Sequence, residues 1–251
     1  MLLYTDLAEY YFEIENHHRN IDTDIAFIRS MLHQVNNPSI LDAGCGSGEH
    51  LNQLIRYGIK CTGMDSSAQM LDVAKKRCSP KIEFVKAEIQ DFDIYEQFNL
   101  IFSIFGTINY LIEDNDLDKA FWNMWRALKP EGKLLLEVWN SYPIESIKQK
   151  NVSKISTTKY GFTTIERNRG FKQLDNYAGK SICEVNYLYI LTGPNGVTQL
   201  QDQHIMRTFT MNELAPFITN NGFEIDYSYG SVLKEPITGK SKKMLIVCRK
   251  E

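Results

Sequence analysis

The segment at residues 40–48 constrains the fold of this chain more than any other. An apolar pair and Asp42 lead into three glycines at alternate positions, Gly44, Gly46 and Gly48, and a helix-like pattern follows at once. Glycine has no Cβ, so it adopts positive φ easily and lets a ligand approach the backbone closely. The segment therefore predicts a tight turn between a strand and a helix, placed against a small molecule.

Short apolar runs alternate with helical patterns around this turn. We expect strands that begin at Ile40 and that lie at residues 61–65, 82–85, 100–104, 134–138, 223–229 and 244–248. Most of the gaps between them carry apolar residues at helical spacing. Strands and helices that alternate with short connections predict an α/β fold with helices on both faces of the sheet. We expect a doubly wound, mostly parallel, seven-stranded Rossmann-like sheet with an antiparallel edge strand.

The pattern changes at residues 141–207, where β-branched and aromatic residues alternate with polar ones. A Pro-Asn-Gly turn signal at residues 194–196 separates two such runs, which predicts an antiparallel sheet. The α/β pattern returns at Thr210 and Glu213, a capping box that opens a helix. An antiparallel β subdomain is therefore expected as an insertion into the α/β domain.

The chain thus divides into three expected parts. Two helices lie within residues 1–37, the α/β domain takes residues 38–140 and 208–251, and the insertion takes residues 141–207.

Composition narrows the classes of partner. The formal net charge of −3 gives no general attraction to nucleic acid or to acidic membranes. Five cysteines are scattered without a C-x-x-C spacing, so neither a zinc site nor a disulfide framework is indicated. The first residues do not resemble a signal peptide, and no apolar run reaches the roughly 20 residues that span a bilayer. We therefore expect a cytoplasmic protein with no metal, no nucleic acid and no membrane partner.

Residues after the glycine turn narrow the range of ligands that the turn could bind. Asp65 ends the second expected strand, close to where a ribose-binding acid follows such a turn. The third strand leads into Glu88 and Ile89, and the fourth leads into a polar and aromatic stretch at residues 103–111. In this order and spacing, the motifs resemble those of class I S-adenosylmethionine-dependent methyltransferases. The resemblance is carried by residues 40–138.

A nicotinamide-dependent dehydrogenase is the main alternative for a glycine-rich turn. Its glycines usually follow G-x-G-x-x-G, with a helix N-terminus held against a pyrophosphate. Here the glycines alternate throughout and Glu49 follows, where a carboxylate beside a pyrophosphate would be unfavourable. The methyltransferase interpretation is therefore favoured. The chain departs from that family at Glu88, where Asp is commoner, and at Glu131, which replaces a glycine.

The resemblance implies a role for each motif. Asp65 would accept hydrogen bonds from the ribose hydroxyls, and Asp42 would face the methionine amino group. Glu88 would bind the adenine amine while Ile89 packs on the ring, and residues 103–105 would lie under the sulfonium. The residues expected to bind S-adenosylmethionine are Tyr11, Asp42, Gly44, Cys45, Gly46, Gly48, Asp65, Ser66, Met70, Glu88, Ile89, Ser103 and Phe105.

The methyl acceptor is implied only by the wider resemblance. The glycine segment, residues 103–111 and the insertion are together similar to the amino-sugar N,N-dimethyltransferases. In that group the inserted sheet roofs the active site and often mediates a homodimer. The resemblance thus implies a small-molecule amine acceptor, S-adenosylhomocysteine as product, and N-terminal helices that cap the site. An O-methyltransferase for a small metabolite and a non-catalytic S-adenosylmethionine-binding protein of the same fold stay open as alternatives.

Acceptor residues are expected where the strands end. Tyr110 and Trp139 follow strands at the carboxyl edge of the sheet, where α/β proteins bind their ligands. His204 ends the inserted sheet and is the expected general base, with Tyr110 as a second catalytic residue. His17 and His18 are expected at the surface or in the lid. The residues expected to bind the acceptor are Thr107, Asn109, Trp139, Tyr142 and Arg207.

Overall fold

The structure is a computed structural model that describes residues 1–16, 20–174 and 179–251. Its larger sheet has the strand order β10-β11-β5-β4-β1-β2-β3. Its strands are β1 (Ser39–Ala43), β2 (Lys60–Asp65), β3 (Glu83–Lys86), β4 (Phe98–Ser103), β5 (Leu128–Trp139), β10 (Phe223–Tyr229) and β11 (Lys243–Lys250). β11 runs antiparallel to both of its neighbours, β5 and the edge strand β10, whereas the other pairs are parallel. The predicted fold class is confirmed.

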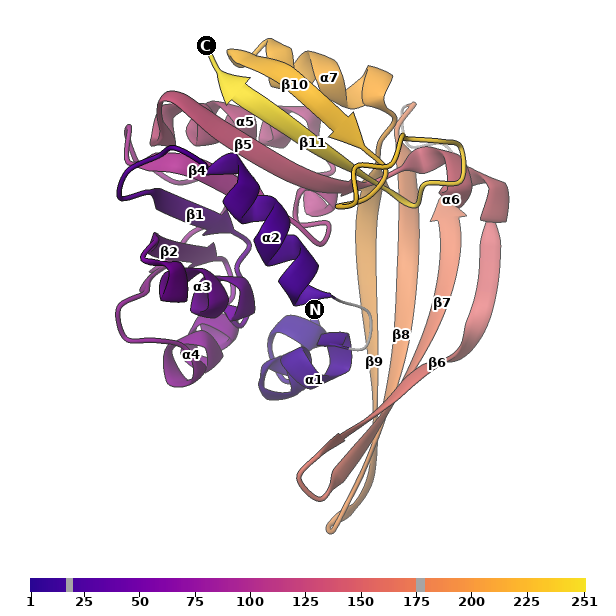
Figure 1. Cartoon of the computed structure of the whole chain (residues 1–251). Helices are drawn as coiled ribbons and strands as arrows, with labels where there is room; N and C mark the ends of the chain where they lie inside the picture. The colour runs from indigo at the N-terminus through magenta and orange to yellow at the C-terminus, as the bar shows by residue number, and fades with distance from the viewer. Residues whose placement is uncertain (17–19, 175–178) are drawn as a thin grey trace.

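Helices cover both faces of this sheet (Figure 1). Within β4, Leu100 and Phe102 face one hydrophobic cluster and Ile101 faces the other, because successive side chains of a strand point to opposite faces. The first cluster includes residues of α2 (Ile21–Met31) and α3 (Glu49–Leu54). The second includes residues of α5 (Asp114–Ala127) and α7 (Met211–Thr219). The central strands β1 and β4 are therefore buried on both faces of the sheet, and the loops at the strand ends are left to form a site.

The second sheet is antiparallel and follows the short helix α6 (Ser141–Ile147), which the sequence pattern did not predict. Its strands, in spatial and chain order, are β6 (Gln149–Tyr160), β7 (Thr163–Leu174), β8 (Ser181–Gly193) and β9 (Gly196–Thr208). β8 and β9 are paired up to Gly193 and Gly196, at the predicted Pro-Asn-Gly turn. Figure 1 shows this sheet extending away from the α/β domain.

The N-terminal segment fills the space between the two sheets (Figure 1). It consists of η1 (Leu2–Tyr4), η2 (Ala8–Tyr10) and α1 (Tyr11–Asn16). A third hydrophobic cluster joins these elements to α4 (Ala68–Arg77) and to the inner face of β8. Both helices expected in this part of the chain are present, as α1 and α2, but two 3-10 turns precede α1. His17 and His18 lie outside the described residues.

Two local predictions can be compared with the structure. The capping box of Thr210 and Glu213 is present in full at the start of α7, and this prediction is confirmed. The strand expected at residues 134–138 is longer, because β5 begins at Leu128. Its early part contains Glu131 at φ 59°, and the pairing with β4 shifts register there. The sequence Pro-Glu-Gly at residues 130–132 is a turn signal, but here it produces an irregularity within the strand rather than a break before it.

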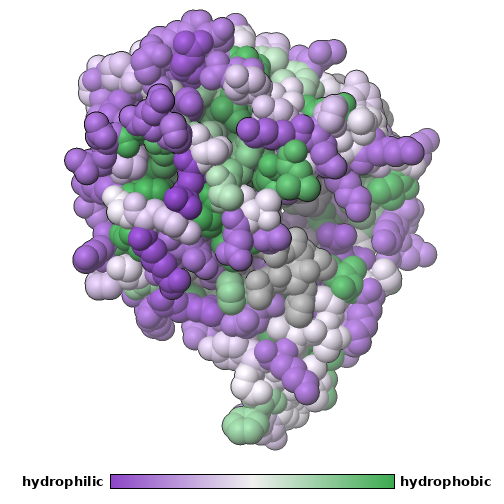
Figure 2. Space-filling view, viewed as in Figure 1, coloured by the Kyte–Doolittle hydropathy of each residue, from purple (hydrophilic) through white to green (hydrophobic). Residues whose placement is uncertain are grey.

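Polar residues cover much of the face seen in Figure 2, with apolar patches between them. In the described residues we find no helix of the length and apolar character that crossing a bilayer requires.

Candidate functional site

A cavity of about 560 Å³ lies at the carboxyl ends of β1, β2 and β4. Ten of the thirteen residues predicted to bind the cofactor line it: Tyr11, Asp42, Gly44, Cys45, Gly46, Asp65, Ser66, Glu88, Ile89 and Phe105. Of the residues predicted on the acceptor side, Thr107 and Tyr110 line it. Segments that are far apart in the sequence therefore meet at one cavity.

The glycine turn has the backbone geometry that its sequence predicts. Gly44, Gly46 and Gly48 have φ angles of 90°, 54° and 81°, a region that L-residues rarely adopt. A Cβ on Gly44 would lie 2.3 Å from the Thr107 hydroxyl oxygen. The turn is held to β2, since the backbone N–H groups of Gly44 and Cys45 both donate to the Met64 carbonyl. Close packing and positive φ together leave no room for a side chain at Gly44.

Asp65 connects the glycine turn to the start of α4. One carboxylate oxygen accepts the Gly46 N–H at 2.8 Å, and the other accepts the Ser67 N–H at 2.9 Å. Burial raises the pKa of Asp65 above its usual value, although these backbone hydrogen bonds act in the opposite direction. The carboxylate lines the cavity in a fixed orientation, so it is placed to accept hydrogen bonds from a ligand.

Three of the residues predicted at the cofactor lie behind the cavity wall. Gly48 caps the N-terminus of α3, and a Cβ there would meet the Cys78 sulfur at 2.8 Å. Met70 is fully buried in α4, and the Ser103 hydroxyl donates to the Ala43 carbonyl at 2.8 Å. In this structure these residues shape the wall rather than the surface of the cavity.

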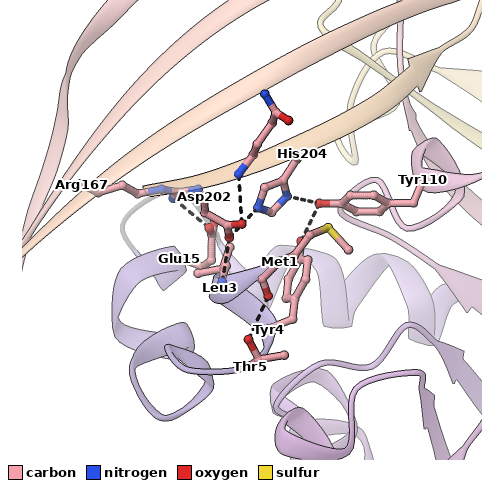
Figure 3. A network of polar contacts seen from close by, with 10 residues as sticks. Met1, Leu3, Tyr4, Thr5, Glu15, Tyr110, Arg167, Asp202 and His204 are labelled. Atoms are coloured by element: carbon pink, nitrogen blue, oxygen red, sulfur yellow. Dashed lines mark hydrogen bonds and ion pairs between the residues drawn. The ribbon is translucent and has the colours of Figure 1, made fainter. Parts of the chain in front are cut away.

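Tyr110 joins the cavity to a chain of buried polar groups (Figure 3). Its hydroxyl lies 2.6 Å from Nδ1 of His204 and 2.9 Å from the Tyr4 hydroxyl. The other ring nitrogen of His204 lies 2.9 Å from a carboxylate oxygen of Asp202. His204 does not line the cavity itself, and only 2% of it is exposed. The predicted base therefore reaches the cavity through Tyr110.

Sequence reasoning missed Asp202, Tyr4 and His50. Asp202 stands two residues before His204, so the period of a strand puts both on one face, and that signal was present in the sequence. Tyr4 lines the cavity from the N-terminal turn, and no motif marks it. His50 also lines the cavity, with Nε2 at 3.4 Å from Asp24.

The remaining predicted acceptor residues contact protein groups. The side chain of Arg207 lies 2.5 Å from Asp114, and its hydrogen bond lowers the pKa of that carboxyl. Trp139 is half-buried beside Gly106, and Tyr142 is 54% exposed. None of these three residues, nor Asn109, lines the cavity.

Asn109 ties three segments together from a fully buried position. Its side-chain NH₂ donates to the Arg207 carbonyl at 2.6 Å, and its side-chain oxygen accepts the Trp139 N–H at 3.1 Å. These bonds fix the turn that carries Tyr110 against β5 and β9.

Replacing Asn109 by alanine is expected to lower the free energy of unfolding by about 2–4 kcal/mol, because two buried backbone groups lose their partners at about 1–3 kcal/mol each. Urea denaturation followed by circular dichroism measures the change. The matched control is Asn36→Ala at an exposed position, which should stay within about 0.5 kcal/mol of the wild type. Equal stability of the two variants would contradict the structural role of Asn109.

Among the residues that the structure describes, no group of three or more His, Cys, Asp or Glu side chains is arranged to hold a metal ion.

The chain is similar in sequence to one protein family and to several individual proteins. The family described as "Methyltransferase domain" matches residues 40–132. The dTDP-3-amino-3,6-dideoxy-alpha-D-glucopyranose N,N-dimethyltransferase of Streptomyces fradiae is 26% identical, over 86% of this chain and 81% of that protein.

The fold was compared with solved structures. An S-adenosylmethionine-dependent methyltransferase from Clostridium acetobutylicum superposes with a TM-score of 0.82 at 15% identity, covering 98% of each chain. CalS10, an amino pentose methyltransferase from Micromonospora echinaspora solved with S-adenosylmethionine bound, gives a TM-score of 0.74 at 17% identity over 96% of each chain. These similarities extend over the inserted sheet as well as the α/β domain.

Proposed function

We propose that this chain, a class I S-adenosylmethionine-dependent methyltransferase, transfers a methyl group to the nitrogen of a small amine, with amino sugars as the first acceptor class to test. The methyltransferase domain, the fold and the similarity to an amino-sugar N,N-dimethyltransferase support the proposal. The observation that carries the choice of acceptor is the Tyr110 hydroxyl at the cavity wall, backed by buried His204 and Asp202. An amine acceptor has to lose a proton, and a proton-accepting group at the cavity wall can receive it.

The residues of the cavity fit S-adenosylmethionine. Its volume of about 560 Å³ lies within the range of small-molecule sites, roughly 300–1,000 Å³. Gly44 packs so closely against Thr107 that it can carry no side chain. Its backbone therefore faces the cavity without a Cβ, so a ligand can approach the turn closely. We propose that Asp65 binds the ribose hydroxyls, that Glu88 and Ile89 hold the adenine, and that Asp42 faces the methionine portion.

The bound cofactor supplies a methyl group activated on a positively charged sulfonium. The protein contributes mainly by holding the acceptor nitrogen in line with that methyl group. We propose that Tyr110 accepts a hydrogen bond from the N–H of the acceptor amine, and that His204 behind it takes up the proton that this amine releases. The rings of Tyr4 and Tyr110 lie edge to face, with centroids 6.1 Å apart. An aromatic ring face can stabilise an ammonium group placed over it. In this proposal the N-terminal turn, which carries Tyr4, acts as the lid.

Two measurements test the proposal. Calorimetry with S-adenosylmethionine and S-adenosylhomocysteine is expected to show saturable binding, and its absence for both would contradict the cofactor site. A panel of amine, hydroxyl and carboxylate acceptors is then scored by S-adenosylhomocysteine release. We expect amines, amino sugars foremost, to give the highest kcat/KM. Faster release with hydroxyl acceptors would favour O-methylation, and cofactor binding without turnover on any acceptor would favour a binding protein.

A further inference from the structure

The carboxylate of Asp202 lies behind the site, where it contacts His204 and not the cavity. We propose that Asp202 is a positioning residue that keeps the His204 proton on Nε2, so that Nδ1 accepts the hydroxyl proton of Tyr110. The expected effect of Asp202 on turnover rests on the proposed methyl transfer to an amine. The position of the His204 proton can be measured without any acceptor.

Asp202 and His204 lie two residues apart on β9 and therefore point to the same side of the strand. Their side chains are only 4% and 2% exposed, and the carboxylate oxygen lies 2.9 Å from Nε2. One carboxylate oxygen accepts the Leu3 N–H at 2.8 Å and the other accepts the Gln203 N–H at 3.0 Å. Burial by itself would raise the pKa of Asp202, but hydrogen bonds, foremost that from His204, and the charge of His204 lower that pKa to about 2. At neutral pH the carboxylate is ionised and can only accept hydrogen bonds. The proton between the two residues therefore resides on Nε2 of His204.

This placement decides the direction of every hydrogen bond that follows. In the neutral form of His204, a proton on Nε2 leaves a lone pair on Nδ1, and in that form the Tyr110 hydroxyl donates across the 2.6 Å contact. Burial raises the pKa of Tyr110 well above its usual value, and the phenol stays neutral with its proton to donate. The lone pairs of the Tyr110 oxygen are then left for the Tyr4 hydroxyl at 2.9 Å and for a donor in the cavity. With the opposite tautomer, Nδ1–H would donate to the Tyr110 oxygen, and the Tyr110 proton would point to the Tyr4 hydroxyl or to the cavity instead of to His204.

The proton balance of the reaction follows this order of bonds. Methyl transfer would form the bond between the acceptor nitrogen and the methyl carbon and break the bond from that carbon to sulfur, whose electron pair would stay on the sulfur of S-adenosylhomocysteine. The nitrogen would then carry one proton more than the neutral product amine. That proton passes to the Tyr110 oxygen while the proton of Tyr110 passes to Nδ1 of His204. The resulting imidazolium is stabilised by the ionised Asp202, and the proton returns to solvent after product release. No oxidant, reductant or further reactant is needed.

The same carboxylate oxygen of Asp202 also holds the N-terminal turn. It accepts the Leu3 N–H at 2.8 Å, and the next residue, Tyr4, accepts the Ser67 hydroxyl through its carbonyl. Figure 3 shows the turn and His204 converging on Asp202. A structural role in anchoring the turn is therefore a competing explanation for Asp202, and the test has to separate it from control of the His204 proton.

Nitrogen-15 NMR of histidine-labelled protein at neutral pH makes this separation, with the His204 signals assigned by His204→Gln. In the wild type we expect a protonated Nε2 and an unprotonated, hydrogen-bonded Nδ1. Tyr110→Phe should keep the proton on Nε2, because Asp202 fixes it, whereas Asp202→Ala should give a mixture of both tautomers. Asp202→Asn retains a carbonyl that can accept from Nε2 and should restore most of the wild-type signal. Because it keeps the shape of the side chain, it also serves if the alanine variant does not fold.

Turnover is measured on the same proteins with the best amine of the panel. Asp202→Ala should lower kcat about tenfold, a part of the roughly 10²–10⁴-fold that positioned proton transfer contributes, and leave S-adenosylhomocysteine affinity within about twofold. A wild-type spectrum with the proton on Nδ1, or an unchanged tautomer in Asp202→Ala, would overturn the inference. A wild-type enzyme that shows the expected tautomer but methylates no amine would instead contradict the proposed function alone.

Discussion

Gly44→Ala is expected to weaken S-adenosylhomocysteine binding by about 100-fold. An added Cβ would lie 2.3 Å from the hydroxyl oxygen and 2.6 Å from the methyl carbon of Thr107, far inside van der Waals contact. The alanine backbone would also have to adopt φ 90°, which L-residues rarely do. Overpacking of this kind costs about 1–3 kcal/mol, and each tenfold loss of affinity corresponds to about 1.4 kcal/mol. Relaxation would move the glycine turn or the turn that carries Thr107, and both form the wall of the cavity.

Calorimetry on two further variants separates the steric clash from backbone strain. Gly58 has φ 75°, close to that of Gly44, but a Cβ added there would have no atom within 4 Å. Gly58→Ala should therefore lose stability through strain and keep its affinity within about twofold. Gly44→Ala combined with Thr107→Gly removes the clashing atoms and should recover part of the binding. Unchanged affinity in Gly44→Ala would contradict the assignment of the glycine turn to the cofactor.

The α/β domain could be predicted because its signals are local. β1 and β4 are short strands of mostly apolar, mostly buried residues, and the glycine turn requires a backbone conformation that few other residues tolerate. The irregular start of β5 could not be predicted, since a turn signal at residues 130–132 does not reveal that the neighbouring strand keeps pairing across it. α6 was missed for a related reason. It lies where two patterns meet, and its Asn140 cap is one residue among several polar ones.

The two halves of the site differ in the same way. Residues on the cofactor side follow directly after strands, so the order of the motifs places them together. The other half depends on contacts between distant segments, such as Leu3 with Asp202 and Tyr110 with His204. Residue type alone also does not show whether a polar side chain faces a cavity or satisfies the backbone. Asn109 bonds to two backbone groups, which only the packed structure reveals.

Tyr110→Phe is expected to lower kcat for an amine acceptor by about 100-fold or more. The substitution keeps the ring in place and removes one oxygen, which lies 2.6 Å from His204 and 2.9 Å from the Tyr4 hydroxyl. Without that oxygen, His204 has no hydrogen-bonded route to the cavity, because the histidine does not line it. Positioned proton transfer contributes typically about 10²–10⁴-fold to a rate, so its loss should appear in kcat. Cofactor affinity should change less than about twofold, since the glycine turn and Asp65 are untouched.

Steady-state kinetics at saturating S-adenosylmethionine, together with calorimetry, tests this expectation. Tyr95→Phe is the matched control, since it makes the same chemical change at a side chain that is 67% exposed and should leave both quantities unchanged. A Tyr110→Phe enzyme with wild-type kcat would show that the amine loses its proton directly to water. A variant with weakened cofactor binding and proportionally lower kcat/KM would show that Tyr110 acts in binding. Only a loss confined to kcat assigns the proton route from the cavity through Tyr110 to His204.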